Sequence, residues 1–253
     1  MAGPMVIRNC HRLEEFQACV ELQREVWDEE PLEVEPRTMF VVAAHTGGQV
    51  IGAFAEDMLV GFILAVAGVR DGRPYLHSHM AAIREAYRNQ GIGRKLKLFQ
   101  REEALQRGIT LLEWTFDPLE VRNAHFNLNR LGAICRKYLP NLYGVTTSPL
   151  HRGLRTDRLL AEWHLDAPRV LATINGGPVQ SGAASDVGPR DDEVRIRVPG
   201  KIPYGTAAGE PVTVDLQDRL RDEFTKWFAQ GYTATAVATG AQPAYLLVHR
   251  NVR

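Results

Sequence analysis

The 253-residue sequence has few cysteines, and those present follow no recognisable pattern. Cys10, Cys19 and Cys135 are odd in number, and no two of them form a Cys-x-x-Cys pair. An odd set without paired spacing argues against a disulfide framework and against a cysteine zinc site. We therefore expect no metal and a reducing cytoplasm as the location.

The sequence also lacks a long apolar run. No segment approaches the roughly 18 unbroken apolar residues of a membrane-spanning helix. Residues 1–6 contain no basic patch followed by an apolar stretch, as a secretory signal would. Both absences predict a soluble protein without a membrane partner.

Charge of one sign is not in excess either. Lys plus Arg and Asp plus Glu both total 30, so net charge gives no reason to expect a nucleic-acid partner. Hydrophobic residues make up 45% and charged residues 24%, which is typical of a globular protein. The length suits one sizeable domain, or one domain with a smaller companion.

The hydrophobic pattern predicts a mixture of helices and strands in the first two thirds of the chain. Helical spacing and boundary residues predict helices over 12–27, 91–107 and 121–131, and another from Pro36 to Gly47, where Val41-Val42 would also suit a strand. Short apolar or alternating segments predict strands over 5–8, 50–54, 58–69, 75–83 and 109–116, with closing strands from 133 and over 158–165.

The last third has a different composition. Residues 175–192 are rich in Gly, Pro, Ser and Asp, which predicts a flexible linker or long loop. Beyond it we expect a helix with an apolar stripe, and three strands; the stripe is Leu216, Leu220, Phe224 and Trp227, the helix 215–229, and the strands 194–198, 232–238 and 244–250. The predicted domains are 1–166, a linker over 167–193, and a small α/β lobe over 194–253.

The most informative stretch joins the strand ending at Ile83 to the helix that follows Gly91. Amide groups in the first helical turn lack an intrahelical partner, and the helix dipole adds partial positive charge there. Glycine side chains leave room for an anion to approach the backbone. Gly91 and Gly93 supply that room, and four basic residues lie nearby: Arg88, Arg94, Lys95 and Lys97. A ligand with several phosphates fits this loop.

Two other phosphate loops do not fit. A Walker A loop needs Lys-Ser or Lys-Thr after its last glycine, but Gly93 is followed by Arg94-Lys95-Leu96. A dinucleotide fingerprint needs a third glycine where Leu96 stands. The simpler alternative is a glycine-rich connection with solvated arginines.

Arg88-x-x-Gly91-x-Gly93 resembles the [RQ]-x-x-G-x-[GA] signature of the GNAT acyltransferase superfamily. The order of predicted elements over residues 5–165 is similar as well. The resemblance implies an α/β (α+β) fold with a mixed, mainly antiparallel central sheet flanked by helices, followed here by a small C-terminal α/β extension that the family pattern does not cover. Residues 114–133 look like those of a bacterial group of predicted acetyltransferases.

The resemblance implies a CoA thioester donor, acetyl-CoA or another short acyl-CoA, as co-substrate. Backbone groups of Ala81, Ala82 and Ile83 would pair with the pantetheine arm as an added strand does. The implied pyrophosphate site is the loop with its following amides: Arg88, Asn89, Gln90, Gly91, Ile92, Gly93 and Arg94. Asn123 is a further candidate contact, although the family spacing places its helix-start Asn near Val121.

Acyl transfer to an amine needs a base, and the strand 75–83 offers His77 and His79. A period of two places both on one face, with Tyr75 and Ala81. Their positions resemble the paired histidines of arylalkylamine N-acetyltransferases. Glu113 is the second candidate base. The alternatives without a catalytic role are that the histidines are hydrogen-bonded core residues and that the glutamate is an exposed surface residue.

One family feature is missing. The common acid of the superfamily is a Tyr four residues before the glycine that ends the second motif helix, and this position is Leu128. Tyr138 and Tyr143 are close in sequence. Another Tyr, a water molecule or solvent then supplies the proton to the leaving thiolate.

The leading hypothesis is therefore an N-acyltransferase acting directly on the primary amine of a small molecule. A second hypothesis is a GNAT-fold module that binds acyl-CoA as a sensor or scaffold without turnover, and a third is a protein N-acetyltransferase. The sequence leaves open the acceptor amine, the acyl chain length and whether the chain forms a homodimer.

Overall fold

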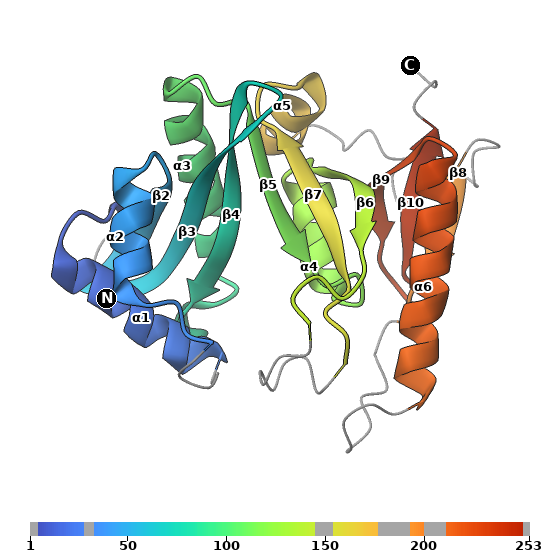
Figure 1. Cartoon of the computed structure of the whole chain (residues 1–253), viewed down its shortest axis with the longest axis horizontal. Helices are drawn as coiled ribbons and strands as arrows, with labels where there is room; N and C mark the ends of the chain where they lie inside the picture. Colours follow the sequence, from blue (N-terminus) through green and yellow to red (C-terminus); the bar gives the residue numbers. More distant parts are fainter. Residues whose placement is uncertain (1–4, 28–32, 145–153, 177–192, 200–210, 250–253) are drawn as a thin grey trace. The chain divides into compact units, whose positions relative to one another are not determined.

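The computed structural model describes residues 5–27, 33–144, 154–176, 193–199 and 211–249. These residues divide into two compact units, one up to Glu113 and the other from Trp114 onwards. We describe each unit separately (Figure 1). No helix in the described ranges is both long and apolar enough to cross a membrane.

The first unit is built on a mainly antiparallel sheet. Strands β1, β2, β3 and β4 lie side by side in chain order and run antiparallel, and the beginning of β5 pairs parallel to β4. Three α-helices and a short 3-10 turn connect them. The bounds are β1 Met5–Asn9, α1 Leu13–Trp27, α2 Arg37–His45, β2 Gln49–Ala55, β3 Met58–Arg70, β4 Arg73–Ile83, η1 Glu85–Tyr87, α3 Ile92–Gln106 and β5 Leu111–Phe116.

The helices cover both faces of this sheet. Phe62 of β3 packs with Phe16 of α1 and Phe40 of α2 in one apolar cluster. The next residue, Ile63, packs with Leu96 of α3 in a second cluster. Because consecutive strand residues point to opposite faces, α1 and α2 cover one face and α3 covers the other.

A lysine lies buried between α3 and the sheet. Lys97 Nζ donates to Ser78 Oγ at 2.8 Å and to Gln100 Oε1 at 3.0 Å, and only 6% of the residue is exposed. Burial disfavours the charged ammonium and lowers the pKa of Lys97 to about 7. This side chain therefore belongs to the interior of the first unit.

The second unit continues from the end of β5 into a five-stranded antiparallel arrangement. The strand order is β7-β6-β9-β10-β8. The bounds are α4 Val121–His125, a π-helical turn η2 Phe126–Arg130, β6 Ile134–Leu139, β7 Arg158–His164, α5 Pro168–Ile174, β8 Glu193–Arg197, α6 Pro211–Ala229, β9 Tyr232–Ala238 and β10 Ala244–His249.

The second unit repeats one connectivity. A strand, a helical segment and an antiparallel strand pair occur first as β5, α4–η2 and β6–β7, then as β8, α6 and β9–β10. The repeats meet where β6 and β9 pair antiparallel at Cys135 and Ala234. The helical segments of the two repeats lie on the same face of the strands. Trp163 of β7 donates to the carbonyl of Leu131, just after η2. Tyr138 pairs with Leu159, which shares a face with Trp163 because the two are four residues apart on β7, and the Tyr138 ring stacks on Phe224 of α6. This arrangement is what an approximate two-fold axis through the β6–β9 contact produces.

Specific polar bonds join the two repeats. The side-chain amide of Asn129 in η2 accepts from Val237 N at 2.9 Å and donates to Val237 O at 3.2 Å, as a neighbouring strand would. Tyr245 OH of β10, fully buried, donates to Pro118 O at 2.7 Å. The guanidinium of Arg169 donates to the carbonyls of Gly132 and Thr235. The C-terminal strands are therefore part of the second unit's interior.

The mixed, mainly antiparallel sheets flanked by helices confirm the predicted fold class. Every predicted helix and strand is present, with boundaries shifted by a few residues at most, and the segment after Pro36 is a helix. The short segments η1 and α5 were not expected. Helix α5 occupies the beginning of the expected linker 167–193, and residues 177–192 lie outside the described residues.

Replacing Phe224 by Ala tests how the C-terminal helix is held. The ring is fully buried and lies 5.8 Å from the ring of Tyr138 and 5.0 Å from that of Tyr245. Loss of a buried aromatic leaves a cavity, so we expect the free energy of unfolding to fall by about 3–5 kcal/mol in urea titrations followed by tryptophan fluorescence. The half-buried Phe228→Ala is the control, with a smaller loss. Equal losses in both variants would contradict this packing.

Lys97 predicts a pH-dependent stability. Its folded pKa of about 7 lies below the ordinary value of 10.5, so between these pH values the unfolded chain binds more protons than the folded one. Stability of the wild type relative to Lys97→Met should rise with pH across this window, by at most about 1.4 kcal/mol per pH unit. The control is Lys95→Met, the same replacement at an exposed position of the same helix. A flat difference for Lys97→Met would show that the lysine is not held in a desolvated site.

Candidate functional site

The loop between β4 and α3 has the backbone of an anion site. Asn89 and Gly91 adopt left-handed conformations with φ of +62° and +77°, and Gly91 is the N-cap of α3. The amide of Lys95 donates to Gly91 O at 3.1 Å. The amides of Ile92 and Gly93 precede that bond, where a helix has no acceptor of its own. They and the helix dipole favour an anion at this point.

The space above the loop is open. A Cβ atom added to Gly91 would meet no atom within 4 Å, so the space on the Cβ side of this residue is open. Gly93 is different, because a Cβ there would lie 3.3 Å from Ile83 Cδ1. Gly91 thus supplies the conformation and the access, and Gly93 lets α3 pack close to the end of β4.

The side chains of the loop mainly hold the loop itself. Arg88 Nε donates to Ile83 O at 3.1 Å, and Gln90 Nε2 donates to Ala86 O at 3.0 Å. Arg88 and Lys95 are exposed at the surface. Lys97, which the sequence grouped with these basic residues, instead points into the interior towards Ser78. A helical period of 3.6 explains the difference, because Lys97 falls on the buried face of α3.

The end of β4 has one strand neighbour. Ala81, Ala82 and Ile83 pair with β3, whereas pairing with β5 is found at Leu76–Leu112 and His77–Glu113. In the described chain no strand therefore lies along the other edge of residues 81–83. An extended ligand segment could add to that edge through backbone hydrogen bonds.

A bulge in β4 decides which side chains share a face. Met80 pairs with Leu64 and Ser78 with Ala65, so His79 is an extra residue in the strand. Ser78 contacts Lys97 on the α3 face, but Met80 packs in the α1–α2 cluster. The alternation therefore changes at His79.

The change of alternation corrects one expectation. His77 pairs with Val66, which packs in the α1–α2 cluster, and the His77 and His79 rings lie 6.5 Å apart, so the two histidines are neighbours as predicted. Ala81 pairs with Ile63 of the α3-face cluster. Its expected place beside the histidines was wrong, because the strict period of two does not continue through a bulge.

The two histidines have different surroundings. Burial, followed by the neighbouring charge of His79, lowers the pKa of His77 below its ordinary value of 6.5. His77 is therefore neutral at neutral pH. His79 Nε2 lies 3.0 Å from Glu35 Oε1, with about 30% of each side chain exposed. The pair thus combines a neutral imidazole with one that contacts a carboxylate.

Glu113 lies beside His77 in the strand register but is engaged by an arginine. Its two carboxylate oxygens accept from Arg70 NH1 at 2.5 Å and NH2 at 2.8 Å, and the residue is 2% exposed. Arg70 also covers the Tyr75 ring at 4.6 Å. Glu113 is thus not an exposed surface glutamate but a buried one held by a bidentate bond to Arg70.

The tyrosines and Asn123 lie in the second unit. Tyr138 OH donates to Asp157 Oδ2 at 2.7 Å, and burial raises the pKa of this phenol, so Tyr138 is a poor proton donor to a ligand. Tyr143 is 46% exposed, with its OH 2.9 Å from Thr115 Oγ1. Leu128, at the expected tyrosine position, is fully buried. Asn123 is exposed on α4 and accepts from Asn127 Nδ2 at 3.3 Å.

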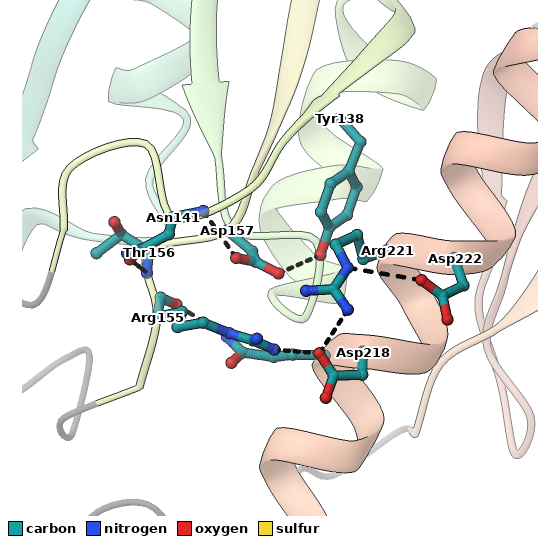
Figure 2. Close-up of polar contacts among 9 residues, drawn as sticks. Tyr138, Asn141, Arg155, Thr156, Asp157, Asp218, Arg221 and Asp222 are labelled. Carbon is teal, nitrogen blue, oxygen red and sulfur yellow. Dashed lines mark hydrogen bonds and ion pairs between the residues drawn. The ribbon is translucent and has the colours of Figure 1, made fainter.

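Asp157 belongs to a polar network that spans β6, the start of β7 and α6 (Figure 2). Its second oxygen accepts from the amide of Asn141 at 2.9 Å. Nearby, Asp218 of α6 accepts from Arg155 NH2 at 2.5 Å and pairs with Arg221 NH2 at 2.9 Å. These bonds join Asn141 to Asp157, and they hold Arg155 against the C-terminal helix.

Sequence reasoning did not identify Glu35 or this network. Glu35 lies 44 residues before His79 in a short segment between two helices, where no periodicity marks it. One bond of the network joins residues 63 positions apart. A run of two glutamates and two prolines over residues 31–36 is the one local signal near Glu35.

The comparisons with known proteins agree with this geometry. The model of the acetyltransferase (GNAT) family matches residues 11–132. A GNAT-family protein from Desulfovibrio desulfuricans is similar at 14% identity and a TM-score of 0.52, covering 64% of this chain and 99% of that one. An Acinetobacter baylyi protein named as an acetyltransferase is similar at 16% identity and a TM-score of 0.53, covering 65% of this chain and 95% of that one. The protein yncA from Salmonella typhimurium, solved with acetyl-CoA, is similar at 16% identity and a TM-score of 0.51, covering 64% of this chain and 94% of that one.

At these identities the structural likeness establishes the fold, and no curated protein matches the chain in sequence. The family model supplies the remaining evidence, because its match includes the β4–α3 loop with Gly91 and Gly93. Residues 11–132 thus match the acetyltransferase (GNAT) family, and this match supports the resemblance seen in the sequence.

Proposed function

We propose that this protein transfers an acetyl or small acyl group from a CoA thioester directly to the primary amine of a small molecule. The observation that carries the proposal is the layout of β4. The strand bears His77 and His79 on one face and then leads through a left-handed Gly91 into the N-terminus of α3. Proton-transfer groups and an anion site thus follow one another along one strand.

The residues present fit the proposed co-substrate. The open backbone at Gly91 and the amides of Ile92 and Gly93 would hold a pyrophosphate, supported by the exposed Arg88 and Lys95. The edge of β4 at Ala81, Ala82 and Ile83 would hold the pantetheine arm. The remaining proposed contacts are Asn89, Gln90 and Arg94 of the loop and Asn123 of α4. When bound, the thioester supplies an electrophilic carbonyl carbon.

The histidine pair would supply the base. An ammonium has no lone pair, so one proton must leave before the amine can attack. His77 and His79 are the candidates, and a neutral imidazole can accept a proton near physiological pH. Glu113 remains a second candidate, although its bond to Arg70 makes it less available.

One other function has specific support, and a third would use the same residues. A GNAT-fold module that binds acyl-CoA without turnover is favoured by Leu128, because a buried leucine cannot protonate a leaving group. A protein N-acetyltransferase would use the same loop and histidines on a larger acceptor. The three free, buried cysteines fit our proposal of a reducing cytoplasm.

Gly91→Val tests the anion site. The new side chain would fill the open space above the loop, so we expect acetyl-CoA affinity in calorimetry to fall by tenfold or more. Gly108→Val is the matched control, because Gly108 at the other end of α3 has a φ of +74° and an equally open Cβ position. Both variants carry similar backbone strain, but only Gly91→Val should lose affinity. Unchanged affinity in a folded Gly91→Val protein would remove the loop from the site.

A double replacement of His77 and His79 by Ala tests the base. We expect turnover to fall by roughly 10²–10⁴-fold, the usual contribution of a positioned base. Acetyl-CoA affinity should change little, because neither histidine belongs to the anion loop. Steady-state release of free CoA measures turnover, and melting temperature serves as the control for folding. A stable double variant with wild-type turnover would rule out both histidines.

A further inference from the structure

The feature that extends the proposed function is the contact between His79 and the segment joining α1 to α2. Glu35 of that segment places its carboxylate 3.0 Å from His79 Nε2. A carboxylate accepts hydrogen bonds and cannot donate them, so Nε2 carries the proton. In the neutral imidazole of His79, Nδ1 is then the nitrogen with a lone pair. One neighbour thus selects one tautomer.

The position of Glu35 is fixed by a buried side chain. Gln23 of α1 is fully buried, and its amide binds both backbone groups of Glu35. Glu35 N donates to Gln23 Oε1 at 2.8 Å, and Gln23 Nε2 donates to Glu35 O at 3.1 Å. A side chain that satisfies both backbone groups holds a residue as a strand neighbour would. The backbone that carries the Glu35 carboxylate is therefore held in place by Gln23.

The bulge fixes the other partner. His79 is the extra residue of β4 opposite Leu64 and Ala65, and a bulge re-aims a side chain without ending the strand. Gln23 of α1 thus positions Glu35, and the bulge in β4 positions His79. A partly exposed ion pair contributes little to stability, so stability alone does not explain the contact between Glu35 and His79.

The two histidines differ in how well each can carry charge. A base that takes a proton becomes an imidazolium, which a neighbouring carboxylate stabilises. Glu35 is such a neighbour for His79. The carboxylate beside His77 is Glu113, whose oxygens already bind Arg70. Added charge at His77 is further opposed by burial and by His79.

From these contacts we infer that His79 is the group that accepts the amine proton and that Glu35 is its positioning residue. The inference rests on the proposed acyl transfer. The ammonium of the acceptor gives one proton to His79 Nδ1, and the Nε2–H bond to Glu35 is kept. The amine lone pair then forms the N–C bond, and the C–S bond breaks. The second amine proton goes to the leaving thiolate, and His79 returns its proton to solvent.

Glu35→Gln is the variant that tests this role. Glutamine has the same shape but can donate as well as accept, so it no longer selects the Nε2–H tautomer. We expect turnover to fall by roughly 10- to 100-fold, the range found for partners that orient ligating histidines. The KM for acetyl-CoA and the melting temperature should stay near wild-type values. Glu21→Gln, an exposed glutamate on α1, is the matched control and should change none of these.

The tautomer provides a readout that does not depend on activity. In ¹⁵N-labelled full-length protein, the His79 nitrogens should show the Nε2–H form in the wild type and a mixture in Glu35→Gln. His79→Ala identifies the signals by their loss, and it should lose more turnover than His77→Ala. Wild-type turnover and an unchanged His79 spectrum in Glu35→Gln would overturn the inference. Absence of CoA release by the wild type with every amine, alongside the expected spectra, would instead contradict the proposed enzyme.

Discussion

The one extra residue in β4 is the constraint on which the first unit's candidate site depends. Before the bulge, Ser78 points to α3 and pairs with the buried Lys97; after it, Met80 points to the opposite face. His79, at the bulge itself, lies beside His77, with the two rings 6.5 Å apart. In a regular strand with His79 in register, Met80 and the residues after it would lie on the opposite faces, because a strand has a period of two. The same strand then ends at the loop that opens α3, so both proposed parts of the site depend on its register.

The second unit is organised by the contact between β6 and β9. Exposed strand edges attract further strands, and here the C-terminal strands supply the neighbour of β6 within the same chain. Register pairing is short, with Cys135 opposite Ala234, and Asn129 extends it by binding both backbone groups of Val237. Tyr138 and Phe224 stack across the same contact. Side chains thus complete a junction that the backbone alone makes over few residues.

The sequence predicted the helices, the strands and the loop well because these features depend on residues that are close together in the chain. Helical spacing and glycine stops place α1 and α3, and the left-handed Gly91 lies where the two-glycine loop predicts close backbone approach. The faces of β4 were predicted only in part, since a bulge depends on the partner strand and has no local signal. Glu35 and Asp157 were missed for a related reason: each acts through partners distant in the chain. The turn η1 and helix α5 are too short for a periodic pattern to show.

The distribution of charge around the loop decides what kind of anion site it is. Of the basic residues near Gly91, Lys97 is withdrawn into the interior, and Arg88 uses its Nε to hold the carbonyl of Ile83. The chain as a whole has no net charge to attract phosphates from a distance. In the proposed anion site, the backbone amides and the dipole of α3 would act at short range and would require the anion to touch the backbone. Such contact is open at Gly91, where a Cβ would meet no atom within 4 Å. In this loop, access to the backbone therefore matters more than the number of positive side chains.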